Sequence, residues 1–346
     1  MKNRFQQLFN ELQNEKSLGP SSPDDHIIIF DGLNTCIRSF AYNEDGDHIG
    51  GITGFLYSIG KTVRDFKPSR CVIAFDGQRG SARRKSIYKD YKANRANKTK
   101  LRRHDHHFTT IEDEQVAMRF QFSRLVSYLD CLPVTFLAMD GIEADDTIAY
   151  IADQYHDKSK KITIVSTDRD FYQLVDDKIQ VWSPIKKKMY DTQTVLEEFN
   201  IHPNNMVLYR SFTGDKSDNI PGVSGIGPKT IQKHLPELAA DKLYTLEDLQ
   251  KKSKSNLNES KTYQKILDNF DTIEQNYKLM NIKLLNIPAA TCSKIRGIMA
   301  QPVPMLDRKE FQRLFYEDKM WSVMKNLPDW LTNTWLSLSA FAKQTH

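Results

Sequence analysis

The sequence predicts an α/β protein in which helices flank a mostly parallel central sheet. Three short apolar runs, HIIIF, CVIAF and KITIV, have the near-continuous apolar content of strands that are buried on both faces. Segments with helical spacing of apolar residues alternate with these runs, which is the pattern of a doubly wound sheet. An aspartate closes each run or follows shortly after it: Asp31, Asp76 and Asp168. Because the carboxyl ends of parallel strands meet at one edge, these aspartates are expected to lie together.

The elements follow in order along the chain. Residues 1–25 are expected to form an N-terminal extension, with a short helix over 1–18 and then a turn rich in Gly, Pro and Ser. The α/β core is expected over 26–200, and the run KIQVWSP at 178–184 adds a candidate strand. The helices of the core are expected at 52–66, 113–129 and 143–155.

The bulk composition is typical of a globular protein. The 346 residues carry a net charge of +5 and a pI of about 8.8, an excess too small to indicate a nucleic-acid partner unless it is concentrated. The four cysteines are far apart and form no CxxC pair, which predicts reduced thiols rather than a zinc ribbon or disulfides. No apolar run reaches the length of a membrane span, and the first residues lack the apolar stretch of a signal peptide. We therefore expect a cytoplasmic protein with no membrane contact.

Positive charge is concentrated between residues 79 and 107. This stretch holds eleven Lys or Arg and two Asp, which is about twice the net charge of the chain and is typical of a phosphate-binding surface. A solvated face is the plain alternative for Arg83, Arg84 and Lys85. The neighbouring histidines could bind a metal, but the polar surroundings favour a solvated loop: His104, His106 and His107.

Acidic residues come from five segments, most of which are expected to converge at the carboxyl edge of the sheet. Ordinary helix N-termini and turn caps explain some of them singly. So many carboxylates cannot stay ionised together without a cation. Mg²⁺ or Mn²⁺ is the natural partner, since no His or Cys accompanies the set. The predicted metal ligands are Asp31, Asp76, Glu143, Asp145, Asp146, Asp168, Asp170, Asp215 and Asp218.

A glycine-rich loop follows Asp215 and Asp218 in the stretch GDKSDNIPGVSGIGPKTIQKHL. Its glycines permit tight turns, and the next helix offers amide donors to phosphate. The loop predicts a helix-hairpin-helix motif within 201–240, with a plain helical corner as the alternative. The residues expected to hold duplex phosphates are Gly222, Gly225, Gly227, Lys229 and Lys233. Two metal ions beside a basic surface indicate phosphodiester hydrolysis.

Three motifs, GIEADD, STDRDFYQL and GDKSDNIPGVSGIGPKT, resemble those of the 5′ nuclease family. The family includes the N-terminal domain of bacterial DNA polymerase I and the flap endonucleases. The resemblance runs from about residue 26 to 235 and implies a PIN-like core. More loosely, residues 171–190 and the region beyond 236 resemble the phage ribonuclease H branch found in T-even phages. The well-formed glycine hairpin departs from that branch.

The resemblance implies a role for each matching residue. One metal cluster is matched by Asp31, Asp76, Glu143 and Asp145, and the other by Asp168, Asp170, Asp215 and Asp218. Asp146 matches a neighbouring acid of the same motif. The segment at about 79–112 matches a basic helical arch, in which Lys92 and Arg95 would contact the scissile phosphate. The other implied nucleic-acid contacts are Arg38, Arg84 and a base stacked on Tyr91. Family members also hold K⁺ at the hairpin.

The resemblance further implies a Mg²⁺-dependent 5′→3′ exonuclease and flap endonuclease with ribonuclease H activity. It would act as a monomer on 5′-flap, forked or nicked DNA and on RNA–DNA hybrids, removing primers and flaps during replication. A helical region over 241–346 is expected, with Trp321, Trp330 and Trp335 in its core and a single-strand-binding protein as a candidate partner. The alternatives are a PIN-type nuclease of single-stranded RNA and a non-catalytic flap-binding protein.

Overall fold

The computed structural model describes residues 22–42, 49–96, 110–283, 287–322 and 324–343. The predicted helix over 1–18 and the three histidines between 104 and 107 lie outside these ranges.

The described residues form a six-stranded sheet in the order β3–β2–β1–β4–β5–β6. The first five strands in this order are parallel, and β6 pairs with β5 in the antiparallel direction. The chain changes its direction of winding between β1 and β4, and in such sheets the crevice for ligands lies at the carboxyl ends of those strands. The strands are β1 (His26–Asp31), β2 (Arg70–Asp76), β3 (Thr135–Met139), β4 (Lys161–Val165), β5 (Ile179–Ser183) and β6 (Lys188–Tyr190).

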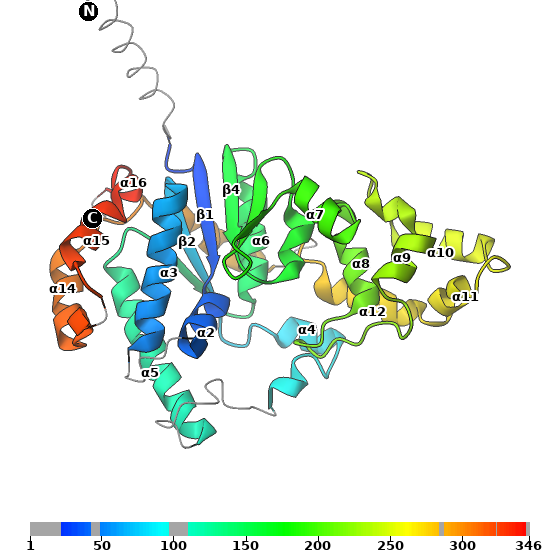
Figure 1. The fold of residues 1–346 in the computed structure, drawn as a ribbon, viewed down its shortest axis with the longest axis horizontal. Coiled ribbons are helices and arrows are strands. Elements are labelled where there is room, and N and C mark those ends of the chain that lie inside the picture. Colours follow the sequence, from blue (N-terminus) through cyan, green and yellow to red (C-terminus); the bar gives the residue numbers. More distant parts are fainter. Residues whose placement is uncertain (1–21, 43–48, 97–109, 284–286, 323, 344–346) are drawn as a thin grey trace, which may run out of the picture.

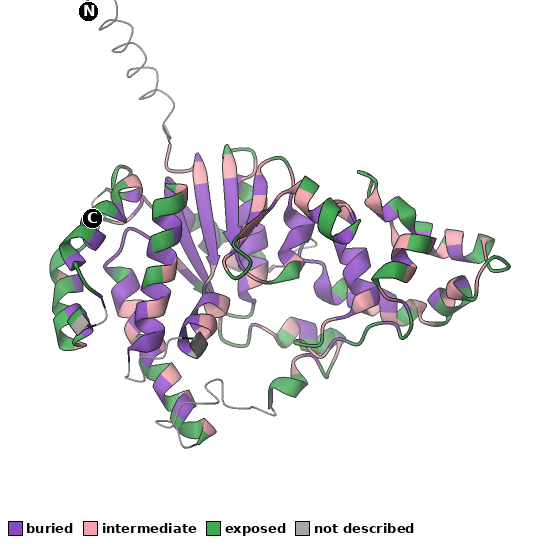
Figure 2. Ribbon diagram, viewed as in Figure 1, coloured by how far each residue is buried: buried purple, intermediate pink, exposed green. Residues whose placement is uncertain are grey.

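Strand β1 is buried on both faces, as its continuous apolar run predicts. Ile27 and Ile29 belong to the apolar cluster on one face of the sheet, while Ile28 and Phe30 belong to the cluster on the other. Figure 2 shows the central strands buried between the two helical layers. Asp31 pairs with Ala74, so Asp76 lies a little further along the neighbouring strand β2.

Helices cover both faces of the sheet (Figure 1). The cluster on one face contains α2, α3 and α5, and the cluster on the other contains α6 and the helices from α7 to α13.

None of the helices described is long and apolar enough to cross a membrane. The helices are α2 (Gly32–Tyr42), α3 (Gly50–Phe66), α4 (Ala82–Ile87), α5 (Ile111–Asp130), α6 (Ala144–Tyr155), α7 (Thr192–Phe199), α8 (Met206–Thr213), α9 (Pro228–His234), α10 (Leu246–Ser255), α11 (Lys261–Asp268), α12 (Phe270–Met280), α13 (Ala289–Met299), α14 (Arg308–Glu317), α15 (Leu327–Asn333) and α16 (Leu336–Ser339).

The predicted C-terminal helical region divides between two places. Helices α10 to α12 extend the side of the molecule that carries the glycine loop, whereas α14 to α16 return to α3 and α5 at the opposite end (Figure 1). We refer to residues 303–342 as the C-terminal cap. The ring of Phe311 packs edge-on against Tyr128 of α5 at 5.0 Å, and the Tyr128 hydroxyl donates to Asp318 over 2.7 Å. Trp335 of the cap is fully buried.

The elements expected from sequence are largely present. Strands β1, β2, β4 and β5 and helices α3, α5 and α6 are confirmed close to their predicted bounds. Strands β3 and β6 at the two sheet edges were not predicted. The expectation of a buried C-terminal tryptophan is confirmed for Trp330 and Trp335 but is wrong for Trp321, which is 51% exposed.

Candidate active site

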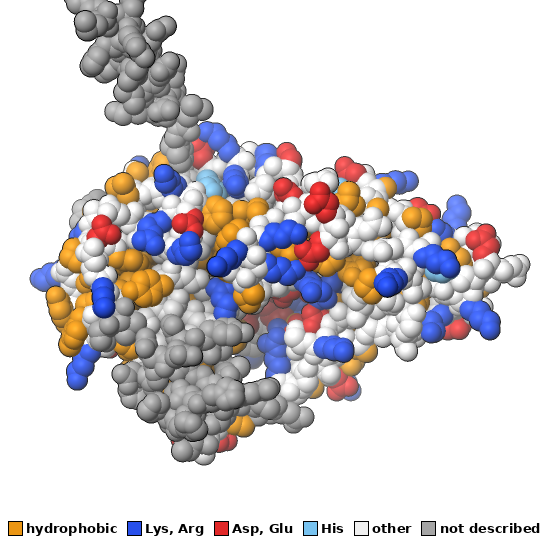
Figure 3. All heavy atoms as spheres, in the orientation of Figure 1, with side chains coloured by type: hydrophobic (Ala, Val, Ile, Leu, Met, Phe, Trp, Pro, Cys, Tyr) orange, Lys and Arg blue, Asp and Glu red, His pale blue; other side chains and the backbone are white. Residues whose placement is uncertain are grey.

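A pocket opens at the carboxyl ends of β1, β2 and β4, where the winding of the sheet reverses. Figure 3 shows acidic side chains at the bottom of a hollow whose rim carries Lys and Arg. Seven of the nine predicted ligands line it: Asp31, Asp76, Glu143, Asp145, Asp168, Asp170 and Asp218. The cationic lining consists of Arg84, Lys92 and Arg95. Residues from five segments of the chain thus meet at one place, as the sequence predicts.

The strand ends position three of these acids. Asp31 closes β1 and accepts hydrogen bonds from the Asn34 amide at 3.1 Å and the Ser166 hydroxyl at 2.9 Å. Burial raises the pKa of Asp31 to about 6 despite these donors. Asp76 closes β2 and accepts from the backbone amide of Ala144 at 2.7 Å, which ties this strand to the start of α6.

Asp168 lies beyond β4, where it caps a short 3-10 turn by accepting from the Asp170 amide at 2.9 Å. Its side chain keeps contact with solvent at the mouth of the pocket, but protein atoms crowd around it. This desolvation, with the nearby charge of Asp170, raises the pKa of Asp168 to about 7. Desolvation also raises the pKa of Asp170 and of Asp145. At Asp31, Asp145, Asp168 and Asp170 the surroundings therefore disfavour negative charge, as a site built for a cation would.

Arg84 of α4 is the main counter-charge at the start of α6. Its guanidinium lies 2.5 Å from Glu143, 2.8 Å from Asp145 and 3.0 Å from Asp146, and its Nε donates to the Leu279 carbonyl. Burial opposes ionisation of Glu143, but Arg84 and Lys92 outweigh it and hold the pKa of Glu143 below its usual value. Arg84 is only 2% exposed. In this structure the Arg84 guanidinium faces protein partners, and its contact with nucleic acid stays a prediction.

Tyr91 is also buried, with 2% of its surface exposed. Its hydroxyl donates to Glu143 and to Asp218, each at 3.0 Å, and so joins α6 to the glycine loop. The ring is thus packed between protein groups, and the stacking of a base on Tyr91 stays a prediction. Lys92 pairs with Glu143, and Arg95 pairs with Asp218 at 2.6 Å. Arg95 remains about half exposed at the pocket mouth.

Two of the predicted ligands, Asp146 and Asp215, lie outside the lining of this pocket and accept several hydrogen bonds each. Asp146 accepts from Arg83, from Arg84 and from the amide of Glu143. Asp215 accepts from the Ser217 amide and hydroxyl, from the Asp218 amide and from Arg210. The four hydrogen bonds to Asp146 divide evenly between its two oxygens, whereas on Asp215 three go to one oxygen and only Arg210 donates to the other. By contrast, one oxygen accepts no hydrogen bond from the described residues in Asp76, Asp168 and Asp170.

Arg210 of α8 is a site residue that sequence reasoning missed. It is 8% exposed, and its guanidinium joins Asp170 to Asp215 at 2.8 and 2.5 Å. A lone arginine in an apolar helix gives no signal by itself; only the neighbouring acids on other segments reveal its role. Arg38, by contrast, was predicted to contact substrate but does not line the pocket. It lies on α2 and donates to the Ser58 hydroxyl at 3.0 Å.

The glycine loop connects α8 to α9. Gly225 has a positive φ of 74°, which favours glycine, and the Nζ of Lys265 stands 2.7 Å from the point that a side chain at Gly225 would occupy. Lys265 of α11 is thus a second basic group at this loop that the sequence did not reveal. Lys229 and Lys233 of α9 are exposed, as expected for contacts to a duplex. The space beside Gly227 is open.

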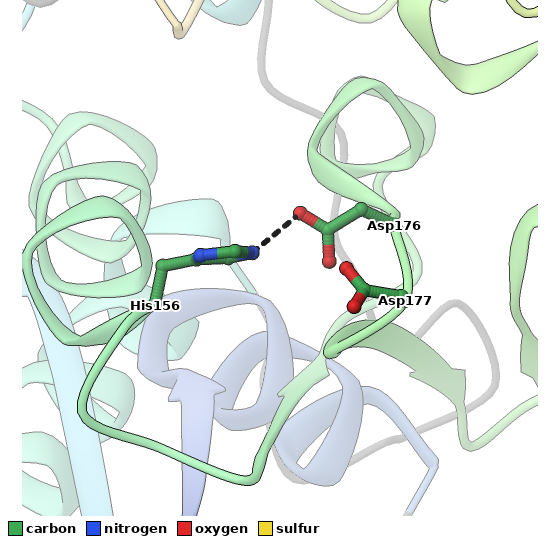
Figure 4. A group of neighbouring side chains, drawn as sticks. All are labelled: His156, Asp176 and Asp177. Atoms are coloured by element: carbon green, nitrogen blue, oxygen red, sulfur yellow. Dashed lines mark ion pairs between the residues drawn. The ribbon is translucent and has the colours of Figure 1, made fainter.

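A second cluster of titratable groups lies away from the pocket (Figure 4). Among the described residues, His156, Asp176 and Asp177 alone place three ligand atoms of His, Cys, Asp or Glu within 4.8 Å of one another. Two of these side chains, His156 and Asp176, are already paired with protein groups. His156 Nε2 lies 3.0 Å from Asp176, its Nδ1 lies 3.2 Å from Asp157, and the other Asp176 oxygen accepts two backbone amides. The described acids of the pocket form no such tight triplet, and several of them are paired with guanidinium or ammonium groups.

The sheet order and the pocket define an α/β protein with a cluster of carboxylates at the carboxyl ends of its parallel strands. A family model described as the 5′-3′ exonuclease N-terminal resolvase-like domain matches residues 26–200, and one described as the 5′-3′ exonuclease C-terminal SAM fold matches 201–293. The chain belongs to the 5′-3′ exonuclease family. The second match takes in the glycine loop and α10 to α12, and it ends before the C-terminal cap.

Curated relatives agree with this family. The chain is 29% identical over 209 residues to a 5′-3′ exonuclease of Aquifex aeolicus, matching 59% of this chain and 66% of the relative. It is 32% identical over 205 residues to a 5′-3′ exonuclease of Bacillus subtilis, matching 58% of this chain and 63% of that one. It is 32% identical over 236 residues to DNA polymerase I of Deinococcus radiodurans, matching 66% of this chain and 23% of the polymerase. The match thus spans less than two thirds of each relative.

Solved structures share the fold. A bacteriophage T5 flap endonuclease, determined with DNA and metal ions, superposes with a TM-score of 0.60 at 19% identity, covering 85% of this chain and 99% of that one. Human GEN1, determined with Holliday junction DNA, gives a TM-score of 0.55 at 15% identity, covering 93% of this chain and 72% of that one. The predicted mostly parallel sheet with a PIN-like core and a helical C-terminal region is confirmed.

Proposed function

We propose that this protein is a Mg²⁺-dependent 5′→3′ nuclease that cuts 5′ flaps and RNA primers by phosphodiester hydrolysis. The observation that carries the proposal is the convergence of seven carboxylates with Lys92 and Arg95 in one pocket at the switch point of the sheet. Relatives include 5′-3′ exonucleases and DNA polymerase I, and a fold neighbour was determined with both DNA and metal ions.

The pocket fits Mg²⁺. Its ligands are oxygens, and carboxyl oxygens on Asp76, Asp168 and Asp170 lack hydrogen-bond donors among the described residues. The residues proposed to hold metal are Asp31, Asp76, Glu143, Asp145, Asp168, Asp170 and Asp218. Asp146 and Asp215, which the sequence had placed in the same set, are proposed instead to hold Arg84 and Arg210 in position. Bound Mg²⁺ would supply the activated water and neutralise charge on the attacked and leaving oxygens.

The protein's own residues bind and orient the substrate. Lys92 and Arg95 are paired with Glu143 and Asp218 at the pocket. We propose that they pair instead with the scissile phosphate when it binds and stabilise its negative charge in the transition state. The glycine loop with Lys229, Lys233 and Lys265 is proposed to hold the phosphate backbone of the duplex, which needs no base reading. K⁺ at this loop, ribonuclease H activity and a monomeric state are proposals that rest on the family resemblance.

The test is cleavage of a 5′-labelled RNA–DNA hybrid and of a 5′-flap DNA by the full chain, with Mg²⁺ and with EDTA. Release of short 5′ fragments only with Mg²⁺ supports the proposal, and loss of cutting in Asp145→Asn and Asp168→Asn supports the pocket as its site. Asp176→Asn is the matched control, because Asp176 is a carboxylate outside the pocket. Tight flap binding without cutting would favour a non-catalytic flap-binding protein. Cutting of single-stranded RNA alone would favour a PIN-type ribonuclease.

The C-terminal cap offers the exposed apolar side chains for the proposed single-strand-binding partner. Tyr316 and Trp321 are 63% and 51% exposed, and their rings lie 6.1 Å apart. The rest of the cap belongs to the core, so deleting the cap would also destabilise the fold. A loss of stimulation in such a deletion could not be assigned to lost binding. Trp321→Ala leaves the core intact, so unchanged stimulation of this variant by a single-strand-binding protein would contradict the proposal.

A further inference from the structure

Arg210 occupies an unusual place beside the pocket. Its Nε lies 2.8 Å from one oxygen of Asp170, its Nη2 lies 2.5 Å from Asp215, and its Nη1 donates to the carbonyl of Gly214 at 3.2 Å. Because Arg210 is only 8% exposed, its guanidinium is held by these protein groups rather than by solvent. Asp170 follows β4 in the α/β core, whereas Asp215 opens the glycine loop. One guanidinium therefore fixes the loop to the reaction pocket.

The charges at this point explain why a cation is needed there. Asp168, Asp170 and Asp218 line the pocket together, and Asp215 lines a neighbouring pocket with Asp168 and Arg210. Close carboxylates repel one another strongly where protein atoms replace water. A guanidinium is always charged and presents its donors in a rigid fork, so it can hold two carboxylates at once. Arg210 leaves the second oxygen of Asp170 without a donor among the described residues.

We propose that Arg210, anchored by Asp215, is a resident counter-cation for the part of the metal site made by Asp170 and Asp218. It holds Asp170 and Asp215 in position before Mg²⁺ arrives, and it remains in place when Mg²⁺ binds the open oxygen of Asp170. Arg210 is then a positioning residue rather than a catalytic one. Because Arg210 already supplies positive charge, the stability of the fold depends less on bound Mg²⁺. This inference rests on the proposed Mg²⁺ site.

A merely structural ion pair would behave differently, and thermal unfolding of the full chain separates the two. In EDTA, Arg210→Gln should lower the Tm, because two carboxylates lose their counter-charge. Mg²⁺ then supplies that charge, so the Mg²⁺-induced rise in Tm should roughly double relative to the wild type, since stabilisation by a ligand follows its affinity for the native state. Arg210→Lys keeps the charge and should show the wild-type rise.

Arg124→Gln is the matched control. Arg124 also joins two acids, Asp318 at 2.7 Å and Glu317 at 2.8 Å, but at the C-terminal cap. Its loss should lower the Tm equally in EDTA and in Mg²⁺. If Arg210→Gln behaves like this control, with an unchanged Mg²⁺-induced rise, Arg210 is a structural ion pair and the inference is overturned. If the wild type itself shows no Mg²⁺-induced rise, the metal site and the proposed function fail instead.

A double variant covers the case in which Arg210→Gln does not fold. Arg210→Gln with Asp215→Asn removes one positive and one negative charge together. If Arg210 acts as a counter-cation, the double variant should fold and should be more stable in EDTA than Arg210→Gln alone. A double variant that is equally unfolded, or less stable, would contradict the inference.

Discussion

The backbone amide of Lys92 donates a hydrogen bond to the carbonyl oxygen of Asp218, 2.8 Å away. This contact joins the basic segment to the glycine loop directly, and it places the ammonium of Lys92 over the pocket beside Glu143. Lys92 has a left-handed backbone, with a φ of 58°. The position of its charge is thus set by the main chain of two segments that are far apart in sequence.

We expect Lys92→Ala to slow cleavage by about 10²- to 10³-fold, because a donor positioned for charge that develops in the transition state has this order of effect. Its effect on duplex affinity should be small, since the glycine loop is the element proposed to make the backbone contacts. Single-turnover cleavage and flap-binding titrations measure the two separately. Lys187→Ala is the control, as Lys187 is an exposed lysine with a similar φ of 50°. Equal losses in rate and affinity would contradict the transition-state role.

The two kinds of acid should respond oppositely to neutralisation. Asp168→Asn should raise the Tm in EDTA, because the pocket disfavours this charge, and should remove both cleavage and Mg²⁺-induced stabilisation. Asp146→Asn leaves the buried Arg84 short of one partner and should cost about 3 to 5 kcal/mol of unfolding free energy. Differential scanning calorimetry with EDTA and with Mg²⁺ checks both. Asp146 would be a metal ligand after all if its variant kept full stability but lost the response to Mg²⁺.

Stability of the metal-free protein should depend on pH through Asp31 and Asp168. Their pKa values of about 6 and about 7 lie above the ordinary 3.8, so the folded state holds these protons more tightly than the unfolded state. The stability that they contribute is present below about pH 4 and is lost as pH rises to about 7. Mg²⁺ affinity should rise over the same window, because fewer protons must leave.

The measurement is the Tm in EDTA across this range, taken as the difference between the wild type and Asp168→Asn. The difference is needed because burial lowers the pKa of His26 to about 4, which destabilises the fold as pH falls and so has the opposite trend. A difference that does not change with pH would show that folding does not shift the pKa of Asp168.

Two glycines of the loop should tolerate alanine differently. A side chain at Gly222 would stand 2.5 Å from the carbonyl oxygen of Thr213, whereas nothing lies within 4 Å of one at Gly227. Gly222→Ala should therefore destabilise the protein by about 1 to 3 kcal/mol, the usual range for overpacking. Gly227→Ala should leave the Tm unchanged and weaken flap binding, because its open space is where a phosphate would approach. A fall in Tm in Gly227→Ala, with binding intact, would reverse this assignment.

The sequence predicts the centre of the fold better than its periphery. The runs that end near Asp31, Asp76 and Asp168 are continuous because they are buried on both faces, and this signal is local. Strand β3 is short and lies at the sheet edge, so its five residues carry no comparable pattern. The convergence of acids follows from the strand ends and the turn motifs, and it too could be predicted.

The partners of those acids could not be predicted in the same way. Arg84 and Arg210 pair with carboxylates on other segments, and Tyr91 is enclosed by α6 and the glycine loop. Charge in the sequence shows that a residue can bind phosphate, but burial alone decides whether it is free to do so. The same holds for α14 to α16, whose apolar spacing does not specify which side of the sheet they cover.

The C-terminal cap has a consequence for the order in which the chain acquires its structure during synthesis. The faces of α3 and α5 that the cap covers are complete by Asp130, yet Phe311 and Trp335 are made much later. A nascent chain on the ribosome therefore carries an uncovered apolar surface for more than half of its translation, and such surfaces recruit chaperones or aggregate. A fragment cut at residue 293, where the second family match stops, would keep that surface exposed permanently.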